Sequence, residues 1–460
     1  MILSKFISFS PESCPPFLSQ DPFFAPPCFV ASPDYFLVNM EVKFLHIADI
    51  HIGIENYGRL DTRTGLHTRL QDFVKCVSFA FEEALSQSVD LVIFSGDAYR
   101  SCDPTPTHQR EFASLVRLLS RERVPLVMVT GNHDSPVAFG KASSIDIFGT
   151  LGPDEIHVVS QDKLIAVETK SGTIQVACLP WLHRSRLVTK APFDNLTQNE
   201  VVEKLQDLGA QLIDGLASQV DPRYPAVLAA HVAAADATLS GSEQTAIIGT
   251  DPVFLTSTLA NPAFDYVALG HIHKFQNLNP SGFPPVVYSG SVERIDFGEE
   301  NEARGAVLVT IQDRDKPDPS GPRRALEYTF LGTPARPFKT FQIEISEDQD
   351  PTRAVLDAVT GHDLSETVVR IIYDLHGNRE DTLDLKAVKQ ALSSAFLVAG
   401  IIRKPKASVR SRRADITEDM GLKDALHAYV LNRPELEAIE QDLQQAAASL
   451  ESELAEGRRP

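Results

Sequence analysis

The sequence predicts an α/β fold with buried sheets, followed by a small βαβαβ unit and C-terminal helices. Short apolar runs rich in β-branched residues, at 43–48, 90–94 and 125–130, are typical of buried strands. Segments with apolar residues at helical spacing, at 66–88 and 106–123, lie between these runs. Such alternation of strands and helices indicates an α/β domain.

The second half of this domain is expected to add another sheet. Apolar runs recur at 173–180, 226–231, 265–270, 285–290 and 305–311, with fewer helical segments between them. We therefore place one domain at residues 40–334. The Gly- and Pro-containing stretch at 332–337 is a candidate linker to the next domain.

The chain after residue 334 has its own pattern. A strand (338–345), helix (351–360), strand (367–375), helix (385–393) and strand (397–402) are expected in that order, as a second domain at 335–407. Residues 408–460 are expected to hold a basic linker and helices. An apolar stripe recurs there at spacings of three and four, at Leu436, Ile439, Leu443, Ala446, Leu450 and Leu454. The stripe packs either on its own domain or on a partner helix or coiled coil.

Composition limits the setting in which the chain works. The net charge of −19 means that no overall basic field attracts nucleic acid. The five cysteines are scattered without a C-x-x-C pair, which argues against a disulfide framework and favours a reducing cytoplasm. No apolar run reaches the roughly 18 residues of a membrane helix. Residues 1–39, rich in Pro, Phe and Ser, are expected to be a disordered extension before an original start at Met40.

Five short polar motifs each follow a predicted strand, where open α/β sheets bind their ligands. They supply Asp49 and His51; Asp97; Asn132, His133 and Asp134; His231; and His271 with His273. Taken singly, a D-x-H triplet, a Gly-Asp turn or a lone His is common without any function. Five of them in this order, each after a strand, predict a metal centre.

The residue types suit two divalent cations. Carboxylate, amide and imidazole ligands without any thiolate favour Mn²⁺, Fe²⁺ or Zn²⁺ over Ca²⁺. Two such cations about 4 Å apart clamp a phosphate and lower the pKa of a bridging water, which points to phosphoester hydrolysis. Asp97 is expected to be shared by both cations. His133 is expected to assist the leaving alkoxide, and Asp134 to orient the His133 ring through its ring N–H.

The motif order resembles that of the calcineurin-like metallophosphoesterase superfamily. Within it, "FLHIADIHIG", "VTGNHDSP", "LGHIHK" and especially "VVYSGSVERIDFGE" resemble the bacterial SbcD nuclease subunits and their archaeal and eukaryotic counterparts of the meiotic-recombination-eleven type. The resemblance covers about residues 42–310 well. It extends more loosely over the βαβαβ unit, which looks like the family's DNA-capping domain. It implies a sandwich of two sheets between helical layers (αββα) for residues 40–334.

The resemblance also implies residue roles and partners. Asp49, His51, Asp97 and His273 match the ligands of one metal, and Asp97, Asn132, His231 and His271 match those of the second. His133 matches the family's catalytic histidine. Family members with this pattern use Mn²⁺, degrade double-stranded DNA from the 3′ side and cut single-stranded DNA internally. They form homodimers and act with an ABC-type coiled-coil ATPase in DNA double-strand-break repair, and the C-terminal stripe fits docking onto that coiled coil.

Other functions fit parts of the same pattern. A phosphatase or a cyclic-nucleotide phosphodiesterase would use the same two-metal core, and a scaffold that recruits the ATPase would keep the fold without activity.

Some family members have a second histidine shortly after D-x-H. His67 is the nearest candidate here, but it stands at a different spacing and in an expected helix, so that role is not assigned to it. The resemblance implies dimerisation through the helices at 66–88 and 106–123.

Overall fold

Two six-stranded sheets form the centre of the computed structural model. The structure describes residues 40–136, 141–184, 197–241, 251–314, 322–376, 380–404, 420–431, 436 and 439–455. The expected extension at 1–39 and the basic residues at 406–413 lie outside this part of the chain. The first sheet has the strand order β14–β13–β1–β2–β3–β4, and the second has the order β11–β12–β10–β7–β6–β5.

Four neighbouring strands of each sheet run parallel, and the strands beyond them pair antiparallel. The first sheet consists of β1 (Glu41–Ile47), β2 (Leu91–Phe94), β3 (Leu126–Val129) and β4 (Ile156–Val159), with β13 (Gly305–Asp313) and β14 (Arg324–Gly332) antiparallel. The second consists of β6 (Gly172–Leu179), β7 (Ala226–His231), β10 (Tyr266–Gly270) and β12 (Val286–Tyr288), with β5 (Lys163–Thr169) and β11 (Gln276–Asn277) antiparallel. A small separate pair joins β8 (Ala233–Ala234) and β9 (Val253–Phe254).

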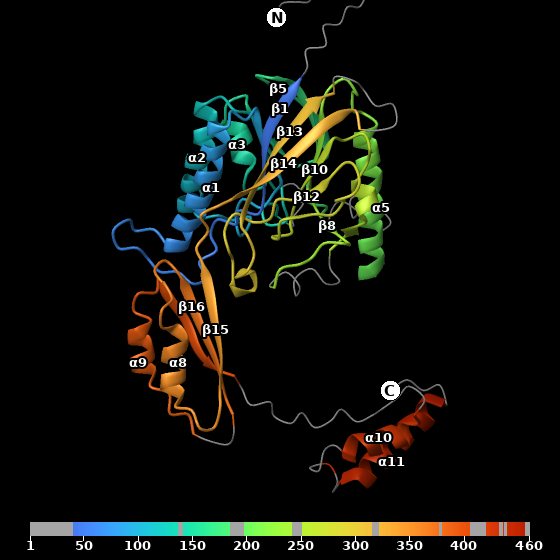
Figure 1. Ribbon diagram of the computed structural model, residues 1–460. Helices are drawn as coiled ribbons and strands as arrows, with labels where there is room; N and C mark the ends of the chain where they lie inside the picture. Colours follow the sequence, from blue (N-terminus) through green and yellow to red (C-terminus); the bar gives the residue numbers. More distant parts are fainter. Residues whose placement is uncertain are drawn as a thin grey trace, which may run out of the picture. The chain divides into compact units, whose positions relative to one another are not determined.

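Alternation along the strands divides the core into three layers. Phe44 and Ile93 face the second sheet and pack against its Val176 and Val227. The opposite face of the first sheet packs on α1 (Thr68–Ser86) and α2 (Pro106–Arg121), and that of the second sheet packs on α5 (Gln198–Ala217). Figure 1 shows α1 and α2 on one side of the sheets and α5 on the other. The expected αββα sandwich is thus confirmed, and α5 is a helix that the strand pattern does not predict.

Local signals explain where the helices begin. The Thr105 side chain caps α2 ahead of Pro106, and Thr197 with Glu200 forms a capping box at α5. His67 caps α1, because its ring accepts a hydrogen bond from the Arg69 N–H. The short helices α3 (Asp146–Leu151), α7 (Thr256–Leu259) and the 3₁₀ turn η1 (Phe297–Glu299) complete the layers.

The βαβαβ unit follows the first domain. Its strands β15 (Phe338–Ile345), β16 (Val368–Leu375) and β17 (Leu397–Arg403) form a parallel sheet covered by α8 (Pro351–Val359) and α9 (Leu385–Ala391). The expected bounds agree with these within two residues. We call residues 338–403 the capping unit below.

Two C-terminal helices end the described chain. α10 (Leu422–Leu431) and α11 (Glu440–Ala455) contact each other. Apolar side chains are exposed at Leu422 and Tyr429 of α10 and at Ile439, directly before α11. Among the described residues, no helix is both long and apolar enough to span a membrane.

Candidate metal centre

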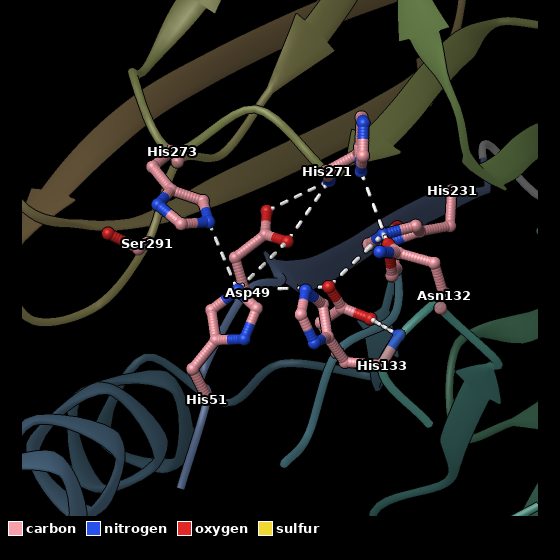
Figure 2. Close-up of polar contacts among 12 residues, drawn as sticks. Asp49, His51, Asn132, His133, His231, His271, His273 and Ser291 are labelled. Atoms are coloured by element: carbon pink, nitrogen blue, oxygen red, sulfur yellow. Dashed lines mark hydrogen bonds and ion pairs between the residues drawn. The ribbon is translucent and has the colours of Figure 1, made fainter. Parts of the chain in front are cut away.

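The five sequence motifs meet at the carboxyl ends of strands from both sheets. Asp49 and His51 follow β1, Asp97 follows β2, and Asn132, His133 and Asp134 follow β3. From the second sheet, His231 ends β7, and His271 and His273 follow β10. Figure 2 shows the labelled side chains from the two sheets pointing toward one another. The site therefore spans the two halves of the sandwich.

One group of side chains gathers around His51. Its Nε2 lies 3.0 Å from Nε2 of His273, 3.7 Å from Oδ2 of Asp97 and 4.0 Å from Oδ1 of Asp49. The candidate ligand atoms of Asp49, His51 and His273 all lie within 4.8 Å of one another. Together with Asp97, these are the residues that the family resemblance assigns to the first metal.

A second group gathers around Asn132 and also reaches Oδ2 of Asp97. Nε2 of His231 lies 3.4 Å from Oδ2 of Asp97 and 2.9 Å from Oδ1 of Asn132. Nδ1 of His271 lies 3.3 Å from the same Asn132 oxygen. Asp97 thus contacts both groups, which is the position that a shared carboxylate needs.

The backbone is strained where it presents these side chains. Asp49, His51, Asp97 and His271 adopt φ values of +52°, +54°, +64° and +104°. Non-glycine residues rarely adopt such angles, which cost about 1–3 kcal/mol each. Each strand end bends sharply to turn its polar side chain into the site, and the rigid sheets behind hold the bends.

Close backbone packing explains the glycine of the third motif. A Cβ atom at Gly131 would lie 2.6 Å from the backbone nitrogen of Asp97 and 2.7 Å from its Cγ. Only glycine allows the loop after β3 to lie directly against the loop after β2.

Burial favours a cation at this site. Burial raises the pKa of Asp49 to about 7, and the nearby charge of Asp97 adds to the shift. Burial opposes ionisation of Asp97, but the charge and hydrogen bond of His231, together with the charges of His51 and His133, outweigh it. They hold the pKa of Asp97 well below its usual value. Burial lowers the pKa of His271 to about 3, so that ring is neutral. Nε2 of His271 is buried without a hydrogen-bond partner, although an Asp251 oxygen lies 3.8 Å away. Two buried carboxylates and a neutral, unsatisfied imidazole fit divalent cations.

His133 differs from the other histidines of this site because it is exposed. Its Nδ1 lies 2.7 Å from the carbonyl oxygen of Arg100, and its ring centroid lies 5.1 Å from that of His51. This contact holds the ring at the edge of the site, where a ring nitrogen of His133 lies within 4.8 Å of candidate ligand atoms of His51 and Asp97.

The prediction that Asp134 orients the His133 ring is wrong, because both groups have other partners. Asp134 is fully buried, and its carboxylate accepts hydrogen bonds from the backbone N–H groups of Asp97 (2.8 Å), Ala98 (2.9 Å) and Gly131 (3.0 Å). The Arg100 carbonyl takes the place at Nδ1 of His133. Asp134 thus holds two ligand loops together and does not orient the His133 ring.

Several residues near the centre escape motif-based prediction. Glu299 contacts the His273 ring at 3.0 Å, and Arg304 donates to the His273 carbonyl at 2.6 Å. Trp181, the only tryptophan of the chain, lies against the His271 ring with centroids 4.9 Å apart. The acidic residue at the end of "GSVERIDFGE" was a usable signal for Glu299, but nothing in the sequence links Trp181 to the site.

The other two histidines considered from the sequence have structural contacts. His46 is buried, with its ring nitrogens 3.2 Å from the Tyr266 hydroxyl and 3.2 Å from the Leu269 carbonyl, and burial lowers its pKa to about 3. His67 caps α1.

Known proteins share this sequence pattern. The model of the calcineurin-like phosphoesterase family matches residues 42–275. The SbcD component of the SbcCD nuclease of Staphylococcus epidermidis is 22% identical over 311 residues, which cover 67% of this chain and 74% of that protein. "DNA double-strand break repair protein Mre11" of Methanosarcina acetivorans is 24% identical over 362 residues, 78% of this chain. The match covers 49% of that protein, so this chain spans about half of its length.

A solved structure also matches. The 5′-nucleotidase precursor of Thermus thermophilus matches 64% of this chain and 54% of its own, at 13% identity and a TM-score of 0.34. The family is shown by the sequence match, which spans half of the chain. The chain belongs to the calcineurin-like phosphoesterase family and is a metal-dependent phosphodiesterase.

Proposed function

We propose that this chain is a DNA nuclease that acts in double-strand-break repair and recombination. The observation that carries the proposal is the extent of the two sequence matches. They cover 67% and 78% of this chain, more than the phosphoesterase region at 42–275. One relative is named as a nuclease subunit and the other as a DNA double-strand break repair protein. The capping unit and the segment "GSVERIDFGE" lie beyond that region.

The geometry supports a division of labour among the residues. Asp49, His51, Asp97 and His273 would hold one cation, and Asp97, Asn132, His231 and His271 the second. When bound, two such cations, here proposed to be Mn²⁺, orient the phosphate and activate a water. His133 protonates the leaving oxygen through Nε2, because Nδ1 is held by the Arg100 carbonyl. Asp134 holds the loops of Asp97 and Gly131 together by accepting hydrogen bonds from their backbone N–H groups.

The expected reactions are 3′-to-5′ degradation of double-stranded DNA and internal cutting of single-stranded DNA. Because the net charge is −19, DNA affinity has to come from the bound cations, local basic residues and a partner protein. An ABC-type coiled-coil ATPase is the proposed partner. α10 and α11 are the proposed docking helices, since Leu422 and Tyr429 of α10 and Ile439, directly before α11, are exposed.

A homodimer is part of the proposal. α1 and α2 contact each other, and an open groove beside α1 is lined by Leu66, Leu70, Val74, Phe79 and Pro334 among others. Helix faces of this kind suit a contact between two copies. Light scattering of the purified protein tests it: a monomeric mass at micromolar concentration contradicts the dimer.

One assay separates the nuclease from a phosphatase or cyclic-nucleotide phosphodiesterase. Purified protein with Mn²⁺ is tested on linear duplex DNA, circular single-stranded DNA, a cyclic nucleotide and a p-nitrophenyl phosphodiester, beside His133→Ala. We expect DNA cleavage by the parent and a large loss in the variant, since general acid catalysis contributes about 10²–10⁴-fold. Hydrolysis of the small esters without DNA cleavage, with or without the ATPase, contradicts the proposal.

The partner proposal has its own test. Deleting residues 415–460 is expected to abolish binding of the ATPase coiled coil and to leave the intrinsic nuclease activity intact. Unchanged binding by the truncated protein rules out the docking role of the C-terminal helices.

A further inference from the structure

His273 is enclosed by the segment 290–299, which the metal motifs do not include. The Ser291 N–H donates to the His273 carbonyl at 3.0 Å, and Arg304 donates to the same oxygen. The ring is held as well: Nδ1 of His273 lies 3.0 Å from Oε1 of Glu299, while Nε2 faces His51. A carboxylate on the far nitrogen of a ligand histidine fixes the tautomer and aims the other nitrogen.

Glu299 is itself rigidly placed. It is fully buried, and its second oxygen accepts the Ile295 N–H at 2.7 Å and lies 3.6 Å from Nη2 of Arg304. A freely rotating carboxylate would not restrict the ring, but this one has partners on both oxygens. The direction of His273 therefore depends on where η1 lies.

The capping unit packs on the same short segment. Phe297 of η1 packs with Phe338 and Val368 of the capping unit, and its ring centroid lies 5.0 Å from that of Phe338. The Arg370 guanidinium lies 4.1 Å from the Phe297 ring centroid. The next residue, Glu300, accepts the Thr340 N–H at 2.9 Å. One turn of 3₁₀ helix thus contacts a proposed metal ligand on one side and the capping unit on the other.

We propose that Glu299 is a positioning residue for His273 and that the capping unit holds Glu299 in place through Phe297. The affinity of the first cation then depends on how the capping unit docks. This inference rests on the ligand assignment in the proposed function. It makes metal loading, and not only access of DNA, sensitive to the capping unit.

Metal binding tests the first half of the proposal. Mn²⁺ is titrated into the parent, Glu299→Gln and His273→Ala, and free Mn²⁺ is measured by electron paramagnetic resonance. We expect Glu299→Gln to lower the affinity for one of the two bound ions by about 10- to 100-fold. This is the same ion whose binding is lost in His273→Ala. The second ion keeps its affinity. Glu300→Gln is the matched control, because its amide oxygen still accepts the Thr340 N–H, and it leaves both affinities unchanged.

A double variant separates positioning from general stability. Glu299→Gln in a His273→Ala background is expected to have no further effect on Mn²⁺ binding. Glu299→Asp, which keeps the charge on a shorter side chain, is expected to be intermediate and serves if Glu299→Gln fails to fold. Affinities for both ions within twofold of the parent in Glu299→Gln overturn the role of Glu299, as does a parent protein that binds no Mn²⁺.

Phe297→Ala tests the link to the capping unit. It removes the ring that packs on Phe338 while leaving Glu299 in the chain, so we expect weaker binding of the same first ion. Ile213→Ala, on the buried face of α5 and outside the capping unit, is the control for loss of stability alone. Unchanged Mn²⁺ affinity in Phe297→Ala, or an equal loss in Ile213→Ala, refutes the coupling. Normal metal binding without DNA cleavage by the parent would instead contradict the proposed function and leave this inference standing.

Discussion

Asp134→Asn is a direct test of how the ligand loops are held together. Oδ2 of Asp134 accepts the N–H groups of Asp97 and Gly131, and Oδ1 accepts that of Ala98. An Asn side chain can keep one oxygen toward the first pair, but its NH₂ group then faces the Ala98 N–H. One hydrogen bond to a charged acceptor is lost, at about 1.5–3 kcal/mol, and the other two weaken to neutral bonds. The free energy of unfolding is expected to fall by about 2–4 kcal/mol.

Urea denaturation at pH 8 measures this loss. At that pH Asp134 is ionised, because burial and the charge of Asp97 raise its pKa only to about 6. Asp363→Asn, at an exposed position of the capping unit, is the control and is expected to change stability by less than about 0.5 kcal/mol. A loss below about 0.5 kcal/mol in Asp134→Asn refutes the reasoning.

A double-mutant cycle with His133→Ala excludes the competing role. If Asp134 acted through the His133 ring, Asp134→Asn would have no further effect on turnover once that ring is gone. We expect a further loss, since Asp134 holds the backbone of Asp97 and not the ring. Absence of any further loss in the double variant would restore the catalytic role expected from the sequence.

Three other predictions follow from contacts at and near the centre. Gly131→Ala is expected to weaken Mn²⁺ binding and cost about 1–3 kcal/mol, because its Cβ would lie 2.6 Å from the Asp97 nitrogen; Mn²⁺ titration and urea denaturation measure both. Arg336→Met removes hydrogen bonds of 2.7 and 2.5 Å to Asp72. The free energy of unfolding is expected to fall by about 1–3 kcal/mol, which a lower urea midpoint of unfolding would show. Adding Mn²⁺ is expected to quench the fluorescence of Trp181, and EDTA to restore it, because that ring lies against His271.

Each of these predictions has a matched control. Gly215→Ala, in α5 with open space around its Cβ, is expected to leave Mn²⁺ binding unchanged, and normal binding by Gly131→Ala contradicts the packing argument. Arg353→Met removes an exposed arginine of α8 and is expected to change stability little; equal effects of both substitutions contradict the role of Arg336. His271→Ala is expected to abolish the fluorescence change, and a full change in that variant would show that Trp181 senses another site.

The sequence by itself determined the strand pattern, the βαβαβ unit and the side chains that gather at the centre. Strands such as β2 (Leu91–Phe94) and β3 (Leu126–Val129) are local apolar runs, and the polar residues that follow them must lie at the strand ends. Since parallel neighbours end at the same edge of a sheet, Asp49, Asp97 and Asn132 could be placed together without coordinates.

Only the tertiary structure decided which partner each of these groups has. Asp134 binds backbone N–H groups contributed by the loop after β2, and Glu299 reaches His273 across 26 positions of the chain. Trp181 and the capping unit reach the centre through contacts between elements that are also distant in sequence. Periodicity reports which face of an element is buried, but hydrogen-bond partners depend on how separate loops pack. The role expected for Asp134 failed for this reason, while its burial at the centre was set by the strand that precedes it.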